Sequence, residues 1–118
     1  MAMILASPRI HQPLHTSIPA FRIASRTSAF PSVIALDGGL LAAHWLEKSG
    51  AGTYAYDVRM ARSADGGATW SEDVIPHRDG LEAEHGFVTL FPVDGDRTGV
   101  VWLDGRETVE GRPMTLRF

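Results

Sequence analysis

The side chains that could carry acid–base or ion-binding chemistry gather in three short segments of the sequence, residues 47–53, 76–86 and 104–112. The apolar runs between these segments hold few such groups. A carboxylate or an imidazole can transfer protons, and an arginine can bind a carboxylate through two parallel hydrogen bonds. The residues of these types that we single out are Glu47, Glu84, His85, Asp104 and Arg106.

A turn motif between residues 63 and 70 indicates how the chain positions these segments. Asp65 is followed by Gly66 and Gly67, and glycine enters positive φ without the steric cost that other residues meet. An Asp side chain in a turn can also accept hydrogen bonds from nearby backbone N–H groups. The motif therefore predicts a tight turn after Ser63, with a new strand starting at Trp70.

The spacing of Ser63, Asp65, Gly67 and Trp70 resembles the Asp-box, or BNR repeat, of the sialidase-like β-propellers. In that family the box is the hairpin between the third and fourth strands of a propeller blade. Its Ser and Asp fold back onto the turn, and its aromatic residue packs against the blade. The resemblance implies a structural role for these four residues and an all-β fold of four-stranded antiparallel blades. It identifies a fold and no reaction.

Short apolar runs separated by turn residues predict the strands of one such blade. The runs cover residues 32–36, 40–46, 54–62 and 70–75, and the Asp-Gly pair at 37–38 is a hairpin signal between the first two. Four antiparallel strands in chain order make one complete blade.

The second half of the sequence repeats the first. Asp94 follows Asp37 by 57 positions, and Trp102 follows Trp45 by the same interval. Residues 88–93 and 99–103 then correspond to the first two strands, and residues 114–118 match the third if one extra loop residue is allowed. A fixed internal period is the signature of a repeat architecture.

These signals divide the chain into three parts. We expect an extended N-terminal arm over residues 1–30, a first blade over 31–76 and a truncated second blade over 77–118. Propellers have about 4–8 blades, whereas this sequence accounts for about one and three-quarter blades, with an uncovered sheet edge. The sequence therefore predicts either a part of a longer gene product or a homo-oligomer, in which the arm could supply a missing strand.

The resemblance also implies what the chain binds. In an antiparallel blade the three ionisable segments lie at the end opposite the Asp-box, where the family binds carbohydrate or glycoconjugate and, in its best-known activity, hydrolyses a terminal sialic acid. For that reaction Glu84, His85 and Asp104 are the catalytic candidates, and Arg106 is the candidate clamp for the substrate carboxylate.

Two further residues are substrate-binding candidates. Residues 21–24, Phe-Arg-Ile-Ala, resemble the Phe-Arg-Ile-Pro motif whose arginine binds the substrate carboxylate in sialidases, which makes Arg22 a candidate beside Glu47. Segment 47–53 contains no Asp, although sialidases usually carry their acid in that loop. Two alternatives stay open: an exo-acting glycoside hydrolase, and a non-catalytic propeller module that binds glycans or proteins, including a self-assembling ring.

Composition narrows the possible partners and cofactors. The chain has 118 residues, a formal charge of −3 and no cysteine, so disulfides are excluded and no basic field favours nucleic acid or an anionic membrane. The five histidines show no metal-ligand spacing, and no phosphate-binding glycine motif is present, so neither a metal nor an organic cofactor is expected. The first residues lack the positive charge of a secretory signal peptide, and the compartment stays open.

Overall fold

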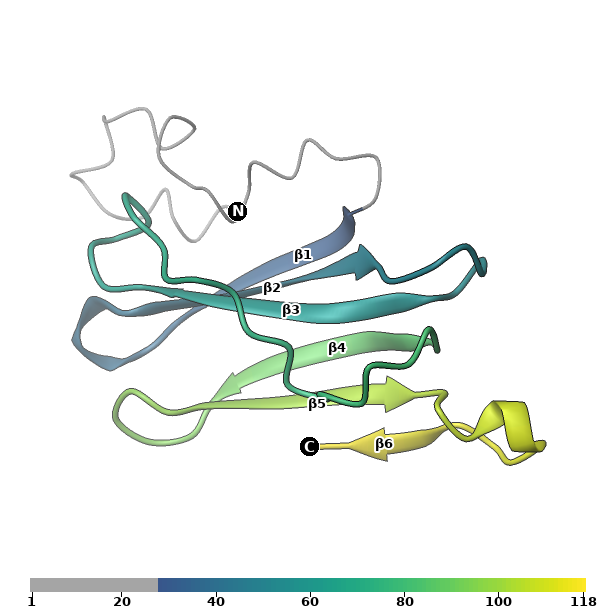
Figure 1. Ribbon diagram of the computed structural model, residues 1–118. Helices are drawn as coiled ribbons and strands as arrows, with labels where there is room; N and C mark the ends of the chain where they lie inside the picture. Colours follow the sequence, from purple (N-terminus) through teal and green to yellow (C-terminus); the bar gives the residue numbers. More distant parts are fainter. Residues whose placement is uncertain (1–27) are drawn as a thin grey trace.

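The computed structural model describes residues 28–118, and these residues form six β-strands and two short 3₁₀ turns (Figure 1). The expected all-β fold is confirmed. None of the helical turns in this part of the chain has the length or apolar character to cross a membrane. The elements are β1 (Ser28–Ala35), a turn at Asp37–Gly39, β2 (Leu41–Lys48), β3 (Tyr56–Ser63), β4 (His85–Pro92), β5 (Thr98–Asp104), a turn at Thr108–Glu110 and β6 (Thr115–Arg117).

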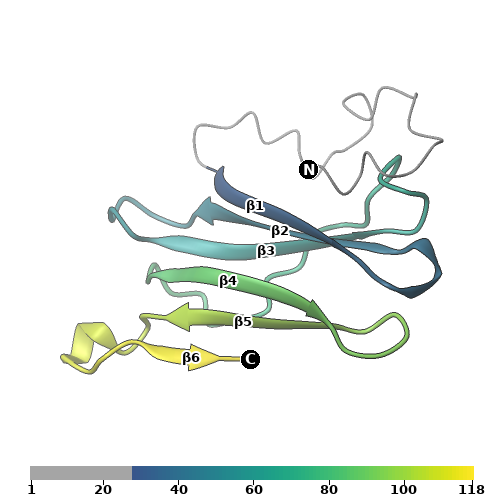
Figure 2. The ribbon, with the colours of Figure 1, turned by 180° about the vertical axis from the view of Figure 1, so that it is seen from behind.

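The strands form two antiparallel sheets, in the orders β1-β2-β3 and β4-β5-β6. Strand β4 lies against β1, β2 and β3, so the second sheet packs on one face of the first (Figures 1 and 2). Within residues 28–118 neither sheet closes on itself.

Two apolar clusters of described residues lie between the sheets. One joins Leu36 and Ala42 to Leu90 of β4, and the other joins Leu46 and Val58 to Trp102 of β5. Burying a large apolar side chain contributes about 1.5–3 kcal/mol relative to leaving it exposed. The association of the two sheets therefore rests mainly on these contacts.

The predicted fourth strand of the first blade is not a regular strand. Residues 70–75 run beside β3, but they form only an isolated bridge, in which Met60 and Val74 exchange two backbone hydrogen bonds of 2.9 and 2.8 Å. Beside this bridge the Ser71 N–H donates to the Arg62 carbonyl (2.8 Å), but the Arg62 N–H donates to the Ser71 side-chain oxygen (3.0 Å), so the regular ladder is interrupted. Within the described residues each sheet thus has three strands, and residues 70–75 add a bridge to the first.

Strand β1 includes the last residues of the predicted arm. It begins at Ser28, and Ser28 and Ala29 pair with β2. The rest of the predicted arm, residues 1–27, lies outside the described residues.

The pairing of β1 with β2 recurs in the pairing of β4 with β5, always 57 positions later. Ser28 stands opposite Glu47 in the first sheet, and His85 stands opposite Asp104 in the second. Both strand pairs carry a register shift at the same place, after residue 29 and after residue 86. The two sheets are therefore structural repeats of one another.

The third strands follow the same rule with one residue added. Leu46 pairs with Val58 in the first sheet, whereas Leu103 pairs with Leu116 in the second, an offset of 58 on the third strand. The extra position falls in the loop between β5 and β6, because the β4–β5 pairing keeps the offset of 57.

The turn over residues 63–70, here called the Asp-box turn, is closed by its own side chains. The Ser63 hydroxyl donates to Asp65 Oδ1 and accepts from the Gly67 N–H, both at 2.8 Å. Asp65 Oδ1 also accepts from the Thr69 N–H (2.8 Å), and Trp70 Nε1 donates to the Gly67 carbonyl (3.1 Å). The Thr69 hydroxyl and N–H, followed by the Ser63 hydroxyl, lower the pKa of Asp65 to about 2.

The strand register shows which loops lie at which end of the molecule. Ser63, at the start of the Asp-box turn, stands opposite Leu41, whereas Tyr56 stands opposite Lys48 at the other end of the sheet. The Asp-box turn therefore lies at the same end of the molecule as the turn between β1 and β2. The loops 49–55, 76–84 and 105–114 lie at the opposite end, where β4 begins (Figure 1).

We expect Ser63→Ala to lower the free energy of unfolding by about 1–3 kcal/mol, because the Gly67 N–H loses its partner in a buried position. Urea unfolding followed by tryptophan fluorescence measures the change. Thr53→Ala, which removes an exposed hydroxyl, is the matched control, and we expect a change within about 0.5 kcal/mol. Equal stability of Ser63→Ala and the unsubstituted chain would contradict this account of the turn.

Candidate functional site

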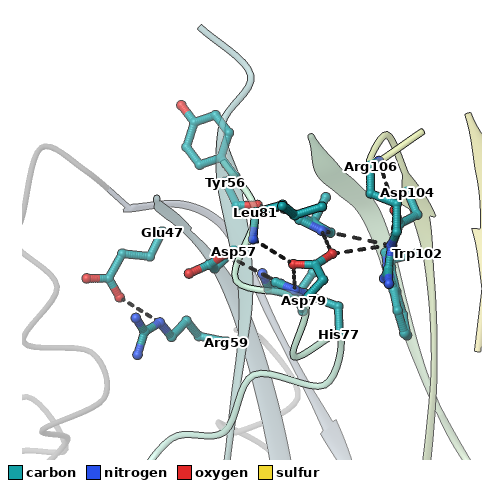
Figure 3. A network of polar contacts seen from close by, with 12 residues as sticks. Glu47, Tyr56, Asp57, Arg59, His77, Asp79, Leu81, Trp102, Asp104 and Arg106 are labelled. Atoms are coloured by element: carbon teal, nitrogen blue, oxygen red, sulfur yellow. Dashed lines mark hydrogen bonds and ion pairs between the residues drawn. The ribbon is translucent and has the colours of Figure 1, made fainter. Parts of the chain in front are cut away.

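Three of the predicted site residues meet in a buried network at the end of the molecule opposite the Asp-box turn. His85 opens β4, Asp104 closes β5 opposite it, and Arg106 follows two residues later. The segment that leads from the Asp-box turn to β4 brings His77 and Asp79 onto them (Figure 3). We call these five residues the buried network.

Asp79 lies at the centre of the buried network (Figure 3). Its Oδ2 atom is 2.8 Å from His85 Nε2 and 3.2 Å from Arg106 Nε, and its Oδ1 atom is 3.2 Å from His77 Nδ1. Oδ1 also accepts from the Leu81 N–H (3.1 Å). Burial alone would raise the pKa of Asp79, but the Leu81 N–H and the adjacent His85 outweigh it and lower that pKa.

Asp104 binds Arg106 through both of its carboxylate oxygens. Arg106 Nε donates to Oδ1 (2.8 Å) and Nη2 donates to Oδ2 (2.6 Å), while Trp102 Nε1 donates to Oδ2 (2.8 Å). The Asp104 side chain is 0% exposed. Burial acts to raise the pKa of Asp104, yet the hydrogen bonds from Arg106 and Trp102 hold it well below its usual range. The Nε–Nη2 edge of Arg106 is thus engaged by Asp104 and is not open to a substrate carboxylate.

The two histidines of the buried network stack ring on ring, with centroids 3.7 Å apart and planes 6° apart. His85 Nδ1 faces the Tyr56 carbonyl (2.7 Å) and Nε2 faces Asp79, and both oxygens can only accept. Each ring nitrogen of His85 therefore lies within hydrogen-bond distance of an acceptor oxygen. His77 Nε2 accepts from the Val58 N–H (3.1 Å), so His77 is neutral with its proton on Nδ1. Burial, and next the charge on His85, lower the pKa of His77.

Groups of opposite charge meet in the buried network. The carboxylates of Asp79 and Asp104 face the Arg106 guanidinium, and the imidazole of His85 lies beside both of them. Buried ions are tolerated in proteins when they are paired and hydrogen-bonded. The side chains of the catalytic candidates His85 and Asp104 are each 0% exposed, and their contacts join β4, β5 and the 76–80 segment.

Two sets of side chains in the described chain have the proximity of metal ligands, one of them Asp79, His85 and Asp104 and the other Asp57, His77 and His85. Arg106 already supplies positive charge to the first set. In the second, His77 Nε2 is engaged by a backbone N–H. In each set at least one donor atom is thus already engaged by another group of the chain.

A groove of about 500 Å³ opens beside the buried network, between the beginnings of β1 and β4. Its lining is mostly apolar. Its polar members include a hydrogen-bonded pair, Ser32 Oγ and His44 Nδ1, 2.8 Å apart on paired strands, and burial lowers the pKa of His44. The lining residues are Phe30, Pro31, Ser32, His44, Leu46, Tyr54, Tyr56, Glu84, His85, Gly86, Phe87 and Val88.

Two phenylalanines that line the groove share an uncommon backbone conformation. Phe30 has a φ of 52° and Phe87 a φ of 49°, and their side chains are 74% and 80% exposed. The two residues are 57 positions apart, so they occupy equivalent places in the β1 and β4 bulges. A left-handed conformation costs a bulky residue about 1–2 kcal/mol, and this cost occurs twice at one groove.

The other predicted site residues have different surroundings. Glu84 is half-buried in the groove lining. Glu47 lies apart from the buried network, where its carboxylate is 3.5 Å from Arg59 Nε (Figure 3). Arg22 lies outside the described residues. The structure thus brings His85, Asp104 and Arg106 together, places Glu84 beside them and leaves Glu47 elsewhere.

Sequence reasoning missed Asp79 and the paired phenylalanines. Asp79 stands in a His-x-Asp-Gly stretch of a loop, and an Asp-Gly pair there reads only as a turn. Phe30 and Phe87 could have been found, because the interval of 57 that relates Trp45 to Trp102 also relates them.

Comparison of the chain with protein-family models, with curated proteins and with solved structures found no match. Its function is therefore argued from the geometry of the buried network and the groove.

We expect Asp104→Asn to lower the free energy of unfolding by about 3–5 kcal/mol, because it leaves buried positive groups without a full countercharge. The measurement is urea unfolding at neutral pH. Asp96→Asn, an exposed position, is the control and should change stability by less than about 0.5 kcal/mol. Similar losses in the two variants would contradict the stabilising role of the buried network.

The lowered pKa of His77 predicts a pH dependence. The unfolded chain, with a histidine pKa of about 6.5, binds this proton more readily than the folded chain does. Stability is therefore fully present above that value and is lost as the pH falls below it, by at most about 1.4 kcal/mol per pH unit for this group. Unfolding at pH 7.5 and 5.5 should show a smaller loss for His77→Asn than for the unsubstituted chain. Equal losses would overturn the assignment.

Proposed function

We propose that the chain is part of a sialidase-like, Asp-box propeller and that its groove binds a terminal sugar of a glycoconjugate. The observation that carries the proposal is the groove itself, flanked by the exposed rings of Phe30 and Phe87 at the end opposite the Asp-box turn. The hydrogen-bonded turn and the 57-residue repeat support the propeller part of the proposal.

The groove has the chemistry that a sugar ring needs. Aromatic rings offer flat apolar surfaces against which the C–H face of a sugar can lie. A few polar groups placed among apolar ones fix the orientation of a ligand. Glu84, His44 and Ser32 are the polar groups suited to bonding sugar hydroxyls. The volume of about 500 Å³ fits a ligand of one or two rings.

The strained backbone points to the same two rings. Sparsely populated conformations persist where the surrounding structure enforces them, and they cluster at binding sites. Because Phe30 and Phe87 are mostly exposed, their side chains contribute little to the core in return for the strain. Contact of both rings with a ligand would account for the left-handed backbone conformation of Phe30 and Phe87.

The composition of the groove favours binding over hydrolysis. Glycosidases of the usual kinds need two carboxyl groups across the scissile bond, and Glu84 is the one carboxylate among the residues that line the described groove. The same residues include no Lys or Arg, so a neutral sugar fits better than an acidic one such as sialic acid. The exo-glycosidase alternative would use Glu84 as its acid, and Glu84→Gln would then abolish hydrolysis of an alkyl glycoside, whose leaving oxygen must be protonated.

The test separates binding from stability. We expect Phe87→Asn to weaken binding of methyl β-galactoside about fivefold, by removing roughly 1 kcal/mol of contact with the ring. The same change should raise the free energy of unfolding by about 1 kcal/mol, because asparagine tolerates the left-handed conformation. Titration by NMR and urea unfolding measure the two effects.

Two comparisons complete the experiment. Phe118→Asn, at a 98% exposed ring outside the groove, should leave sugar binding unchanged. Sialyllactose should bind more weakly than the neutral glycoside. Failure of the unsubstituted chain to bind either sugar, or unaltered binding when Phe30 and Phe87 are both replaced, would overturn the proposed function.

A further inference from the structure

A serine and a histidine that line the groove are hydrogen-bonded to each other. Ser32 Oγ and His44 Nδ1 are 2.8 Å apart, and the two residues stand opposite each other on β1 and β2. A hydroxyl and an imidazole in hydrogen-bond contact are the arrangement in which a histidine takes the proton of a serine nucleophile. We call Ser32 and His44 the Ser–His pair, and both belong to the wall that a molecule in the groove meets.

The β-bulge near the start of β1 creates the Ser–His pair. Ala29 stands opposite Leu46, so an unbroken ladder would put Pro31 opposite His44. The register shift moves Ser32 into that place instead. Bulges re-aim side chains in this way and are over-represented next to active sites.

The structural repeat shows that the strand pairing does not need a Ser–His contact. The residues 57 positions later are Thr89 and Val101, and they stand opposite each other in the same register. A valine side chain has no group that could bond the threonine hydroxyl. The Ser–His pair therefore belongs to the groove and is not a requirement of the repeated scaffold.

The burial of His44 is unfavourable for the core. The residue is 4% exposed, and burying a polar group costs free energy unless its hydrogen bonds are made. Among residues 28–118, Ser32 is the one hydrogen-bond partner of the ring, through Nδ1. The residues two positions away on either side, Ala42 and Leu46, are apolar and pack in the core clusters. A residue that breaks the local rule without a structural gain is expected at a functional site.

The surroundings of His44 suit a base. Burial lowers the pKa of His44, so the ring is neutral at neutral pH and can accept a proton. The other titratable residues of the lining are Tyr54, Tyr56, Glu84 and His85. The two tyrosine hydroxyls are hydrogen-bond donors for a carbonyl oxygen that gains negative charge during a reaction.

We propose that the chain is an esterase in which Ser32 is the nucleophile and His44 the base, acting on the ester of a short carboxylic acid held in the groove. Glycoside cleavage needs a second carboxylate that the described groove lacks, whereas ester cleavage needs a nucleophile and a base. The activity concerns the acyl part of the substrate. It does not depend on the alcohol part being a sugar, and so it extends beyond the proposed function.

The reaction has two halves, each with one proton passing through His44. In the first, Ser32 Oγ forms a bond to the acyl carbon while its proton moves to His44 Nδ1; the ester C–O bond then breaks, and that proton goes to the departing alcohol oxygen. In the second, water forms a bond to the acyl carbon and gives a proton to Nδ1. The bond to Oγ then breaks, the proton returns to Oγ, and the carboxylic acid leaves.

The first experiment treats the full chain with p-nitrophenyl acetate. We expect a burst of nitrophenolate of about one equivalent per chain, because a covalent intermediate accumulates when the acyl group leaves more slowly than it arrives. The intact mass should rise by one acetyl group, and peptide mapping should place that group on Ser32. Absence of a burst, or an acetyl group found only on other residues, would overturn the proposal.

Three variants separate the nucleophile from its surroundings. Ser32→Ala should remove the burst, and Ser32→Cys should retain it and become sensitive to iodoacetamide, because the chain has no other cysteine. Thr89→Ala, at the equivalent exposed position of the second sheet, is the control and should acylate as the unsubstituted chain does. Circular dichroism checks that each variant is folded; if Ser32→Ala is not, the cysteine variant decides. Acylation that is unaltered in Ser32→Ala, or insensitive to iodoacetamide in Ser32→Cys, would contradict the assignment.

The pH profile of acylation tests the base. We expect the rate to fall in acid as His44 takes up a proton, with a midpoint below the value of about 6.5 that is usual for histidine. His44→Gln should slow acylation by about 10²–10⁴-fold and remove this pH dependence. A purely structural histidine would leave the profile of the remaining activity unchanged, and that result would overturn the role of His44.

Discussion

The fold depends on the ionic contact between Asp79 and the ends of β4 and β5. The apolar clusters hold the two sheets together through their middles, but hydrophobic contact has no direction and fixes no loop. The carboxylate of Asp79 meets His85 and Arg106, which belong to different parts of the second sheet. Because buried charges must be paired, the 76–84 segment has one place where it satisfies all of these groups. That constraint positions Glu84 and the start of β4, and hence one wall of the groove.

The repeat explains why the two walls of the groove are alike. Each sheet carries a bulge near the beginning of its first strand, and each bulge puts a phenylalanine in the left-handed conformation. Since β4 lies against β1, the rings of Phe30 and Phe87 come to the same groove from equivalent positions. A β-bulge re-aims a side chain out of the regular alternation. The two walls of the groove are thus formed by the same β-bulge, once in each sheet.

Much of the architecture could be predicted from the sequence, because strand runs and turns are signalled locally. The turn between Ser63 and Trp70, the six strands and the repeat interval all follow from short patterns. A strand over residues 70–75 was predicted, but its interruption could not be, because it depends on the Ser71 hydroxyl taking the Arg62 N–H. The ionisable candidates His85, Asp104 and Arg106 were identified from the sequence. Their contacts with Asp79 could not be, because these join loops and strands that no local pattern relates.

Residues at equivalent positions of the two sheets have the same backbone pairing but different side-chain surroundings. Glu47 and Asp104 each close the second strand of their sheet, opposite Ser28 and His85. The Glu47 side chain is 37% exposed and meets Arg59 on its own sheet, whereas that of Asp104 is 0% exposed and belongs to the buried network. Backbone pairing is the same in both places, so the difference comes from the segment that Asp79 anchors over the second sheet. The repeat supplies the same backbone scaffold twice, and the segment that Asp79 anchors covers one copy of it.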